Sequence, residues 1–149
     1  VPLPGPLHRS GATMLVRDCM TTKVFSLRLD KKMIAVEELM QWAQIRHIPV
    51  VDQQGKLAGI ISHRDLLHAA ISAIADAPAV ERKRYLGAIP ITKVMRTQVH
   101  TVSPDAPVQE AARRMRASKI GCLPVLAEGK LIGIISEFDL LGIVEQLKD

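Results

Sequence analysis

Residues 59–67 read GIISHRDLL, and residues 133–141 read GIISEFDLL. Seven of the nine positions are identical, and the two that differ, His63-Arg64 against Glu137-Phe138, lie directly before an aspartate. A repeated segment of this length indicates that the chain contains two copies of one structural unit. The pair that changes indicates that the two copies are not chemically equal.

The repeat extends well beyond this nonamer. At an offset of 75 residues, VRDCMTTKVFSL from Val16 aligns with ITKVMRTQVHTV from Ile91, and the later IPVV aligns with LPVL. After a glycine-containing turn, where VVDQQGKLAG becomes VLAEGKLIG, the offset is 74, so that Asp65 aligns with Asp139. A one-residue deletion inside a turn is what a β-hairpin tolerates.

Each copy has the same predicted order of elements, which is strand, helix, strand, strand, helix. Short strands are predicted around residues 24–27 and 99–102, and Asp30 and Asp105 are predicted to cap the helices that follow. Apolar residues recur at helical spacing in both of these helices: Val36, Leu39, Met40 and Ala43, then Val108, Ala111, Ala112 and Met115. The second of them is expected to end near Gly121. Two apolar strands then flank a polar turn, and another helix follows the aspartate of each nonamer.

Composition limits the class of protein. A chain of 149 residues that is 48% hydrophobic can bury one ordinary core or two small ones. Neither an apolar run of about 18 residues nor the layout of a secretory signal can be recognised, so a cytoplasmic protein without a membrane span is expected. Residues 1–13, with three prolines and two glycines, are expected to form a flexible arm. Two domains are then predicted at 14–75 and 91–149, with a linker at 76–90.

Cysteines and charge exclude further classes. Cys19 and Cys122 are too few for a disulfide framework and are predicted to be small buried thiols. The formal net charge of +5 and the pI of about 9.5 would suit nucleic acid. However, aromatic residues make up only 3% of the chain, and the basic residues are scattered among acids. A structural or nucleic-acid-associated oligomerisation module is therefore the alternative prediction.

An enzyme is not expected. Catalysis requires a nucleophile with its base, a paired acid and base, or a set of metal ligands, and no such pattern can be recognised in the sequence. Of the five histidines, His8 lies in the predicted arm, and neither His68 nor His100 has an obvious acidic partner in sequence. His47 and His63 lie near the residues that are interpreted below as ligand-binding. We therefore expect neither a catalytic cofactor nor a metal.

The order of these motifs resembles a tandem pair of CBS domains, also called a Bateman module, a regulatory unit first named from cystathionine beta-synthase. The resemblance spans Val16 to about Glu145. It rests on the segments beginning at Met20, His47 and Gly55 and on their counterparts from Met95, Leu123 and Gly129. It departs from the family at Lys93, where an acid is frequent.

The resemblance implies an α+β fold in which two β-α-β-β-α domains pack as a pseudo-twofold disc with a cleft on each side. It also implies adenosine-containing regulatory ligands in these clefts: AMP, ADP or ATP first, with NAD and S-adenosylmethionine also compatible. Occupancy of the clefts would be transmitted to an effector protein, which the sequence does not identify.

The sequence S-x-x-D, at 62–65 and 136–139, has two interpretations. It is a capping box that begins a helix. It can also place a carboxylate at a helix N-terminus, where free amide groups and the helix dipole favour the oxygens of a ribose or phosphate. In the family the aspartate binds the ribose diol and the hydroxyl residue assists. The two interpretations do not exclude each other.

The resemblance further implies that each site combines the S-x-x-D end of one copy with the first strand and the pre-proline pair of the other. Site A then comprises Asp139, Ser136, Phe138, Ile134, Thr22, Val24, Arg46 and His47. Site B comprises Asp65, Ser62, Arg64, Ile60, Thr97, Val99, Gly121 and Cys122. The threonines and valines would supply a backbone edge for adenine, although the valines are equally typical of ordinary strand residues. The isoleucines would line the pockets and would be core residues in any case.

The two sites are expected to differ in affinity. Arg46 and His47 stand where adenylate-sensing members of the family place basic residues against phosphates, and the alternative is a solvated helix end. Phe138 is expected to pack on the base or sugar of the ligand in site A, whereas site B has Arg64 beside its aspartate. The competing interpretation is that His63 and Arg64 only face solvent on the first turn of their helix.

Self-association is also expected. The helices that contain LLHAAISAIA and LLGIVEQL carry apolar faces, and family members pair these helices into homodimers. Packing between the two copies within one chain is the alternative use of these faces.

Overall fold

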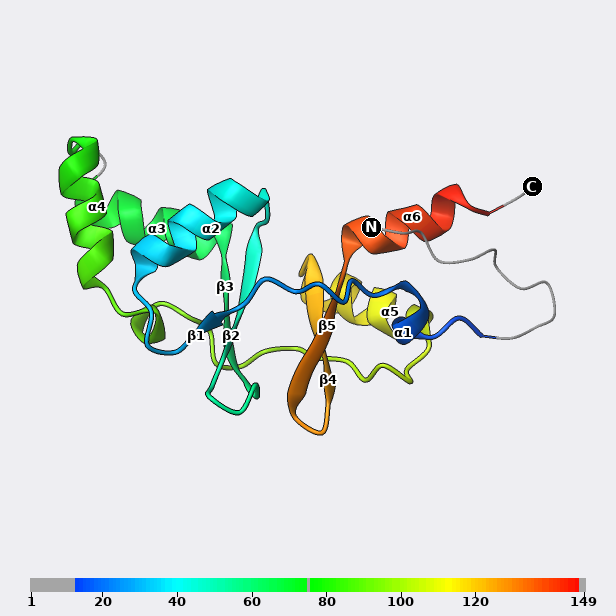
Figure 1. Cartoon of the computed structure of the whole chain (residues 1–149). Helices are drawn as coiled ribbons and strands as arrows, with labels where there is room; N and C mark the ends of the chain where they lie inside the picture. Colours follow the sequence, from blue (N-terminus) through cyan, green and yellow to red (C-terminus); the bar gives the residue numbers. More distant parts are fainter. Residues whose placement is uncertain (1–12, 75, 148–149) are drawn as a thin grey trace. The chain divides into compact units, whose positions relative to one another are not determined.

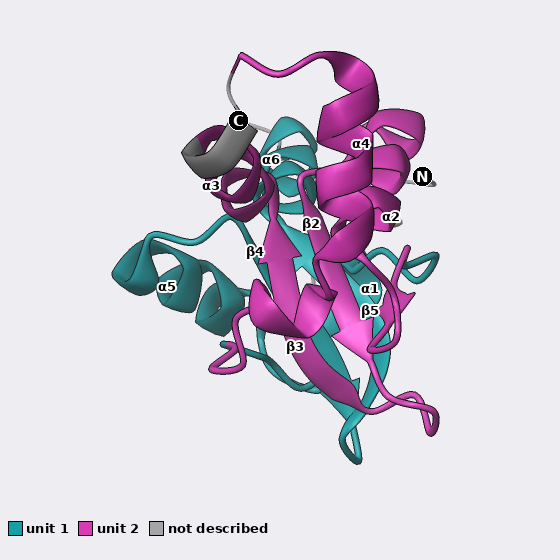
Figure 2. Ribbon diagram, turned by 90° about the vertical axis from the view of Figure 1, so that its left-hand side faces the viewer, with its two compact units in different colours: residues 1–24, 100–149 teal, residues 25–99 magenta. Residues whose placement is uncertain are grey.

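The computed structural model describes residues 13–74 and 76–147. The chain divides into two compact units, shown in different colours in Figure 2. Unit 2 comprises Phe25–Val99, and unit 1 combines the segment that ends at Val24 with the segment that begins at His100. Each unit therefore contains the first segment of the other sequence repeat, so the units differ from the predicted domains 14–75 and 91–149. Except for Thr13, the predicted arm 1–13 lies outside the described residues.

Unit 2 contains a three-stranded sheet in the order β1-β2-β3. Strand β1 (Leu27–Arg28) is parallel to β2 (His47–Val51), and β2 is antiparallel to β3 (Leu57–Ser62). The helices of this unit are α2 (Met33–Ala43), α3 (His63–Ile74) and α4 (Ala79–Ala88), followed by the 3-10 turn η1 (Ile91–Lys93). Helix α2 packs against both α3 and α4 (Figure 1).

Unit 1 contains an antiparallel hairpin with β4 (Cys122–Ala127) and β5 (Lys130–Ser136). Its helices are α1 (Val16–Cys19), α5 (Val108–Ser118) and α6 (Glu137–Glu145). The hairpin turn consists of Glu128 (φ 54°) and Gly129 (φ 80°). Two consecutive residues with positive φ form the tight turn that matches the twist of the flanking strands, which explains the glycine in this short loop.

Each unit has its own hydrophobic core. In unit 2 the buried side chains come from α2, β2, β3, α3, α4 and η1: Met33, Val36, Met40, Ile48, Val50, Ile61, Leu66, Leu86 and Ile91. In unit 1 they come from α1, the segment before α5, α5 itself and the hairpin: Val16, Cys19, Val102, Val108, Ala111, Met115, Leu123, Val125 and Ile135. The helical spacing found in the sequence thus marks the buried face of α2 and α5, and the predicted α+β fold is confirmed.

The predicted helix ends were partly wrong. The N-caps of α2 and α5 are Lys32 and Pro107, and neither forms a side-chain cap, so Asp30 and Asp105 are not the capping residues. Helix α5 ends before Lys119, which adopts the left-handed conformation with φ 53°, rather than at Gly121. A lysine in this conformation bears a steric cost that glycine would avoid, so the sequence rule pointed to the wrong residue.

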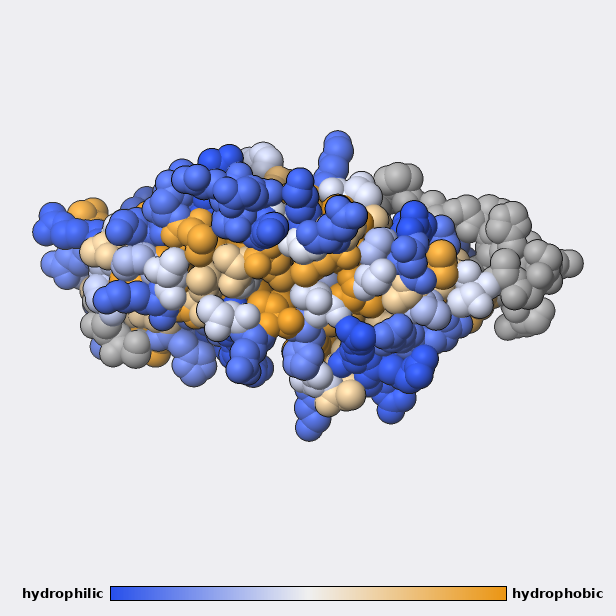
Figure 3. Space-filling model, turned by 90° about the horizontal axis from the view of Figure 1, so that it is seen from below, coloured by the Kyte–Doolittle hydropathy of each residue, from blue (hydrophilic) through white to orange (hydrophobic). Residues whose placement is uncertain are grey.

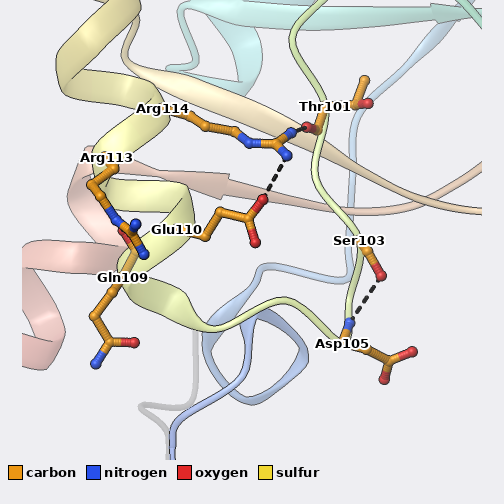
Figure 4. Close-up of polar contacts among 7 residues, drawn as sticks. All are labelled: Thr101, Ser103, Asp105, Gln109, Glu110, Arg113 and Arg114. Carbon is orange, nitrogen blue, oxygen red and sulfur yellow. Dashed lines mark hydrogen bonds and ion pairs between the residues drawn. The ribbon is translucent and has the colours of Figure 1, made fainter.

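Asp105 instead belongs to a set of polar contacts around the start of α5. Its backbone N–H donates to Ser103 Oγ at 3.2 Å (Figure 4), and its carboxylate forms an ion pair with Arg17 of α1. Within α5, Arg114 pairs with Glu110 at 2.6 Å and donates to the carbonyl of Thr101. The segment after His100 is thus attached to α1 through Asp105 and to α5 through Thr101.

The first strands are shorter than predicted. Strand β1 begins at Leu27, so residues 22–26 lie before it, and the second copy forms only an isolated bridge between Val102 and Val125. The segment predicted as a linker at 76–90 is also different, because it contains α4. Leu86 of this helix is fully buried, and the carbonyl of Ile89 accepts a hydrogen bond from the backbone of Met33 at 2.8 Å. This segment is therefore part of the unit 2 core.

Apolar side chains also reach the surface. On α3 the exposed ones are Leu67 and Ile71, and on α6 they include Leu141 and Val144. One face of the molecule shows hydrophobic residues among hydrophilic ones (Figure 3). Within the described ranges, every helix is too short or too polar to pass through a membrane.

Candidate functional site

The aspartate of each nonamer lies at the start of a helix, and we call its surroundings a seat. In the Asp139 seat of unit 1, Ser136 is the N-cap of α6. The backbone N–H of Ser136 donates to Asp139 Oδ2 at 2.8 Å, and that of Asp139 donates to Ser136 Oγ at 3.3 Å. The hydroxyl of Thr21 donates to the other carboxylate oxygen, Oδ1, at 3.2 Å.

The Asp65 seat of unit 2 has the same backbone arrangement. Ser62 N–H donates to Asp65 Oδ2 at 2.8 Å, and Asp65 N–H donates to Ser62 Oγ at 3.1 Å. Here Oδ1 is contacted by Nε of Arg96 at 3.3 Å, in an ion pair. Both S-x-x-D segments thus form a capping box in the structure. The capping box uses Oδ2 of each aspartate, and Oδ1 is contacted by Thr21 in one seat and by Arg96 in the other.

The first glycine of each nonamer explains how these neighbours come so close. The segment that holds Thr21 pairs with β5, and the segment that holds Arg96 pairs with β3. A Cβ added to Gly133 would lie 2.7 Å from the sulfur of Met20, and one added to Gly59 would lie 2.7 Å from the carbonyl oxygen of Arg96. Both distances are shorter than van der Waals contact allows, so a larger residue at either position would force its neighbour to shift: the paired backbone of Arg96 at Gly59, and the flexible side chain of Met20 at Gly133.

Thr21 and Arg96 were not among the predicted site residues. They align at the offset of 75, directly after Met20 and Met95. The available signal was this alignment, which places a neutral hydroxyl in one copy and a guanidinium in the other. It was missed because Thr21 and Arg96 are 118 and 31 residues away from the aspartates that they contact, and no local pattern reports such a pair.

The predicted adenine-binding residues are placed near the seats within their own units. Thr22 and Val24 follow directly after Thr21 in unit 1, and Thr97 and Val99 follow Arg96 in unit 2. Both threonines are exposed and both valines are half-buried. None of the four lies in a strand, so the prediction that Val24 and Val99 are strand residues was wrong. The isoleucines that pair with Thr21 and Arg96, Ile134 and Ile60, are half-buried.

The remaining predicted residues are divided between the units. Arg46 and His47 belong to unit 2, and the carbonyl of Arg46 accepts a hydrogen bond from His63 N–H at 2.7 Å. Gly121 and Cys122 belong to unit 1, where the Gly121 carbonyl accepts from Glu137 N–H at 2.9 Å. These pairs therefore contact the helix start of their own unit. Their predicted combination with the seat of the other unit stays a prediction.

The side chains that precede the aspartates are on the surface. Phe138 is 80% exposed, and His63, Arg64 and Glu137 are exposed as well. The phenyl ring therefore has its surface open to solvent or to a bound molecule.

Both cysteines are buried free thiols, as predicted. Burial, together with the nearby carboxylates of Asp139 and Asp18, raises the pKa of Cys19 to about 11. Burial, with a smaller contribution from Glu137, raises the pKa of Cys122 to about 12. Because the thiolate is the reactive form, these environments make both thiols unreactive near neutral pH.

Among the described residues, no group of three or more His, Cys, Asp or Glu side chains is placed so that it could hold a metal ion. The chemistry of the two seats is instead that of hydrogen-bond acceptors at helix N-termini.

The family model of the CBS domain matches residues 16–72 and 83–146. The chain therefore belongs to the CBS domain family, and its two matched segments make it a tandem CBS pair. A CBS domain-containing protein of Dictyostelium discoideum is 33% identical over 132 residues, which cover 88% of this chain and 91% of that protein. The homoserine O-acetyltransferase of Methanococcoides burtonii is 32% identical, but the match covers only 23% of that enzyme and 84% of this chain.

Solved structures agree with this assignment. A candidate acetoin utilization protein, AcuB, of Vibrio cholerae is 36% identical and superimposes with a TM-score of 0.77, covering 90% of this chain and 92% of that one. The protein CBSX2, solved in complex with AMP, is 25% identical with a TM-score of 0.76 and covers 91% and 98% of the two chains. A CBS domain pair solved with 5'-methylthioadenosine and S-adenosyl-L-methionine has the same fold, with 24% identity and a TM-score of 0.75, covering 92% of this chain and all of that one.

Proposed function

We propose that this chain is a regulatory module that binds adenosine-containing ligands at its two aspartate seats. The observation that carries the proposal is the position of Oδ1 of Asp139 and Asp65, the carboxylate oxygen that the capping box leaves outside. A carboxylate oxygen at a helix N-terminus can accept hydrogen bonds from a ribose diol. The AMP complex of CBSX2, which resembles this chain over nearly its whole length, supports the same ligand class.

The residues near each seat have separate proposed roles. The backbone of 22–24 and of 97–99, which lies outside the strands, would supply the hydrogen-bonding edge for adenine. Phe138, with its exposed ring, would pack on the base or sugar at the Asp139 seat. Arg46 and His47 would contact the phosphates of a ligand held by Asp139, whereas Gly121 and Cys122, near the ligand of Asp65, bring no charge.

We propose no catalytic role for the module. Among the nucleotides, AMP, ADP and ATP are the first candidates, and NAD and S-adenosylmethionine share the adenosine part that the seats address. Ligand binding would act on a partner protein by favouring one of two arrangements of the chain, and it can do so only through a difference in affinity for the two. A cytoplasmic setting fits the two free thiols.

We also propose that the chain forms a homodimer through α3 and α6. The support is the exposed apolar side chains on these helices, Leu67 and Ile71 on α3 and Leu141 and Val144 on α6. Sedimentation velocity at micromolar concentration should show a species of twice the chain mass of 16.4 kDa. A single species of monomer mass at all concentrations would reject the dimer.

A ligand panel tests the binding function. Thermal unfolding of the chain should shift upwards with AMP, ADP, ATP, NAD or S-adenosylmethionine, because a ligand at 100 times its Kd stabilises the folded state by about 2.7 kcal/mol. Guanosine nucleotides at the same concentration are the matched control for base recognition. If no member of the adenosine panel changes the unfolding temperature, the proposal is wrong. Chromatography after incubation with ATP should return the nucleotide unchanged.

A further inference from the structure

The residue beside each seat aspartate carries the clearest chemical difference between the two units. Thr21 and Arg96 occupy equivalent positions in the backbone. Thr21 exchanges two backbone hydrogen bonds with Ile134, at 2.8 and 2.9 Å, and Arg96 exchanges two with Ile60, at 3.0 and 2.9 Å. The two side chains therefore approach their aspartates from corresponding places, and their contacts can be compared directly.

Both side chains contact the same carboxylate oxygen. The Thr21 hydroxyl donates a hydrogen bond to Asp139 Oδ1 at 3.2 Å, and Arg96 Nε donates one to Asp65 Oδ1 at 3.3 Å. A hydroxyl can rotate away or remain as an additional donor while a ribose hydroxyl also donates to the same oxygen. The guanidinium of Arg96 forms a charge-assisted contact with Asp65, and a ribose hydroxyl, which is neutral, must compete with that contact. The two oxygens are thus unequally available to a ribose.

The helix turns that begin at the two seats increase this difference. The first turn of α3 adds Arg64 near Asp65, so that these aligned positions, with Arg96, hold two cations and one carboxylate. The first turn of α6 has Glu137 and Phe138 where α3 has His63 and Arg64. Positions 137–139, together with Thr21, therefore hold two carboxylates and no cation. Among these positions, only those of the Asp65 seat suit a dianionic phosphate.

We propose that Arg96 makes the Asp65 seat selective for adenosine ligands that carry a phosphate, because the phosphate replaces Asp65 as the anion paired with Arg96; Asp139, which contacts the neutral Thr21, has no such ion pair to release. This inference rests on the proposed function. The Arg96 side chain is 66% exposed, whereas that of Asp65 is 12% exposed. A phosphate can therefore reach the guanidinium from solvent and bind it with the two-pronged geometry that arginine provides. Arg96 then leaves Asp65 Oδ1 free for the ribose diol of the same ligand.

A nucleoside without phosphate lacks this compensation. It must displace Arg96 from Asp65 without providing another anion for the guanidinium. Loss of one charge-assisted interaction corresponds to about tenfold to a hundredfold in affinity. We therefore expect Arg96 to make the Asp65 seat prefer AMP over adenosine by about tenfold to a hundredfold in affinity.

Reciprocal exchange of the two residues tests the proposal, with each seat isolated by removing the other aspartate. In the Asp139→Ala background, titration calorimetry with AMP and adenosine measures the Asp65 seat, and adding Arg96→Thr should lower the AMP-to-adenosine ratio about tenfold or more. In the Asp65→Ala background, adding Thr21→Arg should raise the ratio at the Asp139 seat. Circular dichroism of each variant checks folding, and Arg96→Met, which keeps the apolar stem, replaces Arg96→Thr if that variant does not fold.

The outcomes separate this inference from the proposed function. If the unmodified chain binds neither AMP nor adenosine, the proposed function itself fails. If both ligands bind and neither Arg96→Thr nor Arg96→Met changes the ratio at the Asp65 seat, Arg96 is not a selector, although the module still binds nucleotides. Absence of all binding in the Asp139→Ala background, with binding retained in the Asp65→Ala background, would also overturn the inference.

Discussion

A Cβ on Gly59 would lie 2.7 Å from the carbonyl oxygen of Arg96, whereas a Cβ on the equivalent Gly133 would lie 2.7 Å from the side-chain sulfur of Met20 and 3.1 Å from the carbonyl of Thr21. The repeated glycine thus faces backbone most closely in one unit and a flexible side chain in the other. A thioether can move aside at little cost, but a paired backbone segment cannot.

Gly59→Ala should therefore destabilise the protein more than Gly133→Ala. We expect a loss of about 1–3 kcal/mol for Gly59→Ala, the usual range for overpacking, and a smaller loss for Gly133→Ala. Urea unfolding measures both. Gly87→Ala is the matched control, because its Cβ would lie 3.9 Å from Ile34 in ordinary contact, and alanine in helix α4 should be neutral or slightly stabilising. Equal losses at Gly59 and Gly133 would contradict the argument.

The serine caps should contribute to stability independently of ligand. Ser136→Ala and Ser62→Ala each remove the acceptor for the aspartate N–H and should cost about 1 kcal/mol in the free energy of unfolding. The same variants in the presence of saturating AMP test whether the hydroxyl also assists the ligand. An unchanged affinity would restrict the serines to capping.

Arg46→Ala tests the predicted phosphate contact at the Asp139 seat. In the Asp65→Ala background, it should weaken AMP and ATP but leave adenosine almost unchanged, because the guanidinium addresses only the phosphates. Lys23→Ala, which also removes one exposed cation near the same seat in sequence, is the control for general charge. An equal loss for adenosine and AMP would show that Arg46 acts on the fold of the site and not on phosphate.

The two thiols predict a loss of stability at high pH. The pKa of Cys19 is about 11 and that of Cys122 about 12 in the folded chain, against a reference value of 9.0. Below pH 9 both thiols are protonated whether the chain is folded or unfolded, so they add no pH dependence. Above it the unfolded chain ionises first, and stability falls as pH rises towards the folded values, by at most about 1.4 kcal/mol per pH unit for each thiol.

Urea unfolding between pH 8 and pH 10.5 measures this loss. The Cys19→Ala, Cys122→Ala double variant should be less stable at pH 8 but should show a shallower decline, because the contribution of the two thiols is removed. Identical slopes in the two proteins would mean that the thiols are not protected by burial.

The compact units, and not the sequence repeats, should be the folding units. A fragment of residues 25–99 contains a complete core and should fold alone, which the fluorescence of Trp42, the sole tryptophan, can follow through its edge-on contact with Phe25. A fragment of residues 14–75, bounded as a sequence repeat, lacks Leu86 and Ile91 of that core and should be unfolded or much less stable. Cooperative unfolding of the 14–75 fragment with similar stability would show that the repeat is sufficient.

Much of the fold could be predicted because its local signals are strong. The apolar runs on both sides of a polar turn in the hairpins and the helical spacing in α2 and α5 are properties of short segments, and the repetition of each pattern made it more reliable. The start of α2 at Lys32 could not be predicted, since its backbone pairs with Pro90, far away in the sequence. The end of α5 at Lys119 could not be predicted because a lysine rarely adopts the left-handed conformation. Helix α4 was missed because mixed charge and flanking prolines are also typical of linkers, and only the burial of Leu86 shows the difference.

The candidate site was predictable to a similar degree. The aspartates and their serines follow from the S-x-x-D spacing, since the contacts involved lie within four residues. Thr21 and Arg96 are 118 and 31 residues from the aspartates that they contact. No local pattern reports such a pair, and the exchange of first segments between the repeats had no signal in the spacing.

This exchange has a consequence for the order in which the protein is made. Unit 2 is one continuous stretch, so all of it is available once the ribosome has released residue 99. Unit 1 cannot be completed until α5, the hairpin and α6 have followed, so the α1 segment, although synthesised before unit 2, must wait without its partners until α6 has been released. During that interval Val16 and Cys19 are exposed to the solvent and to other nascent chains.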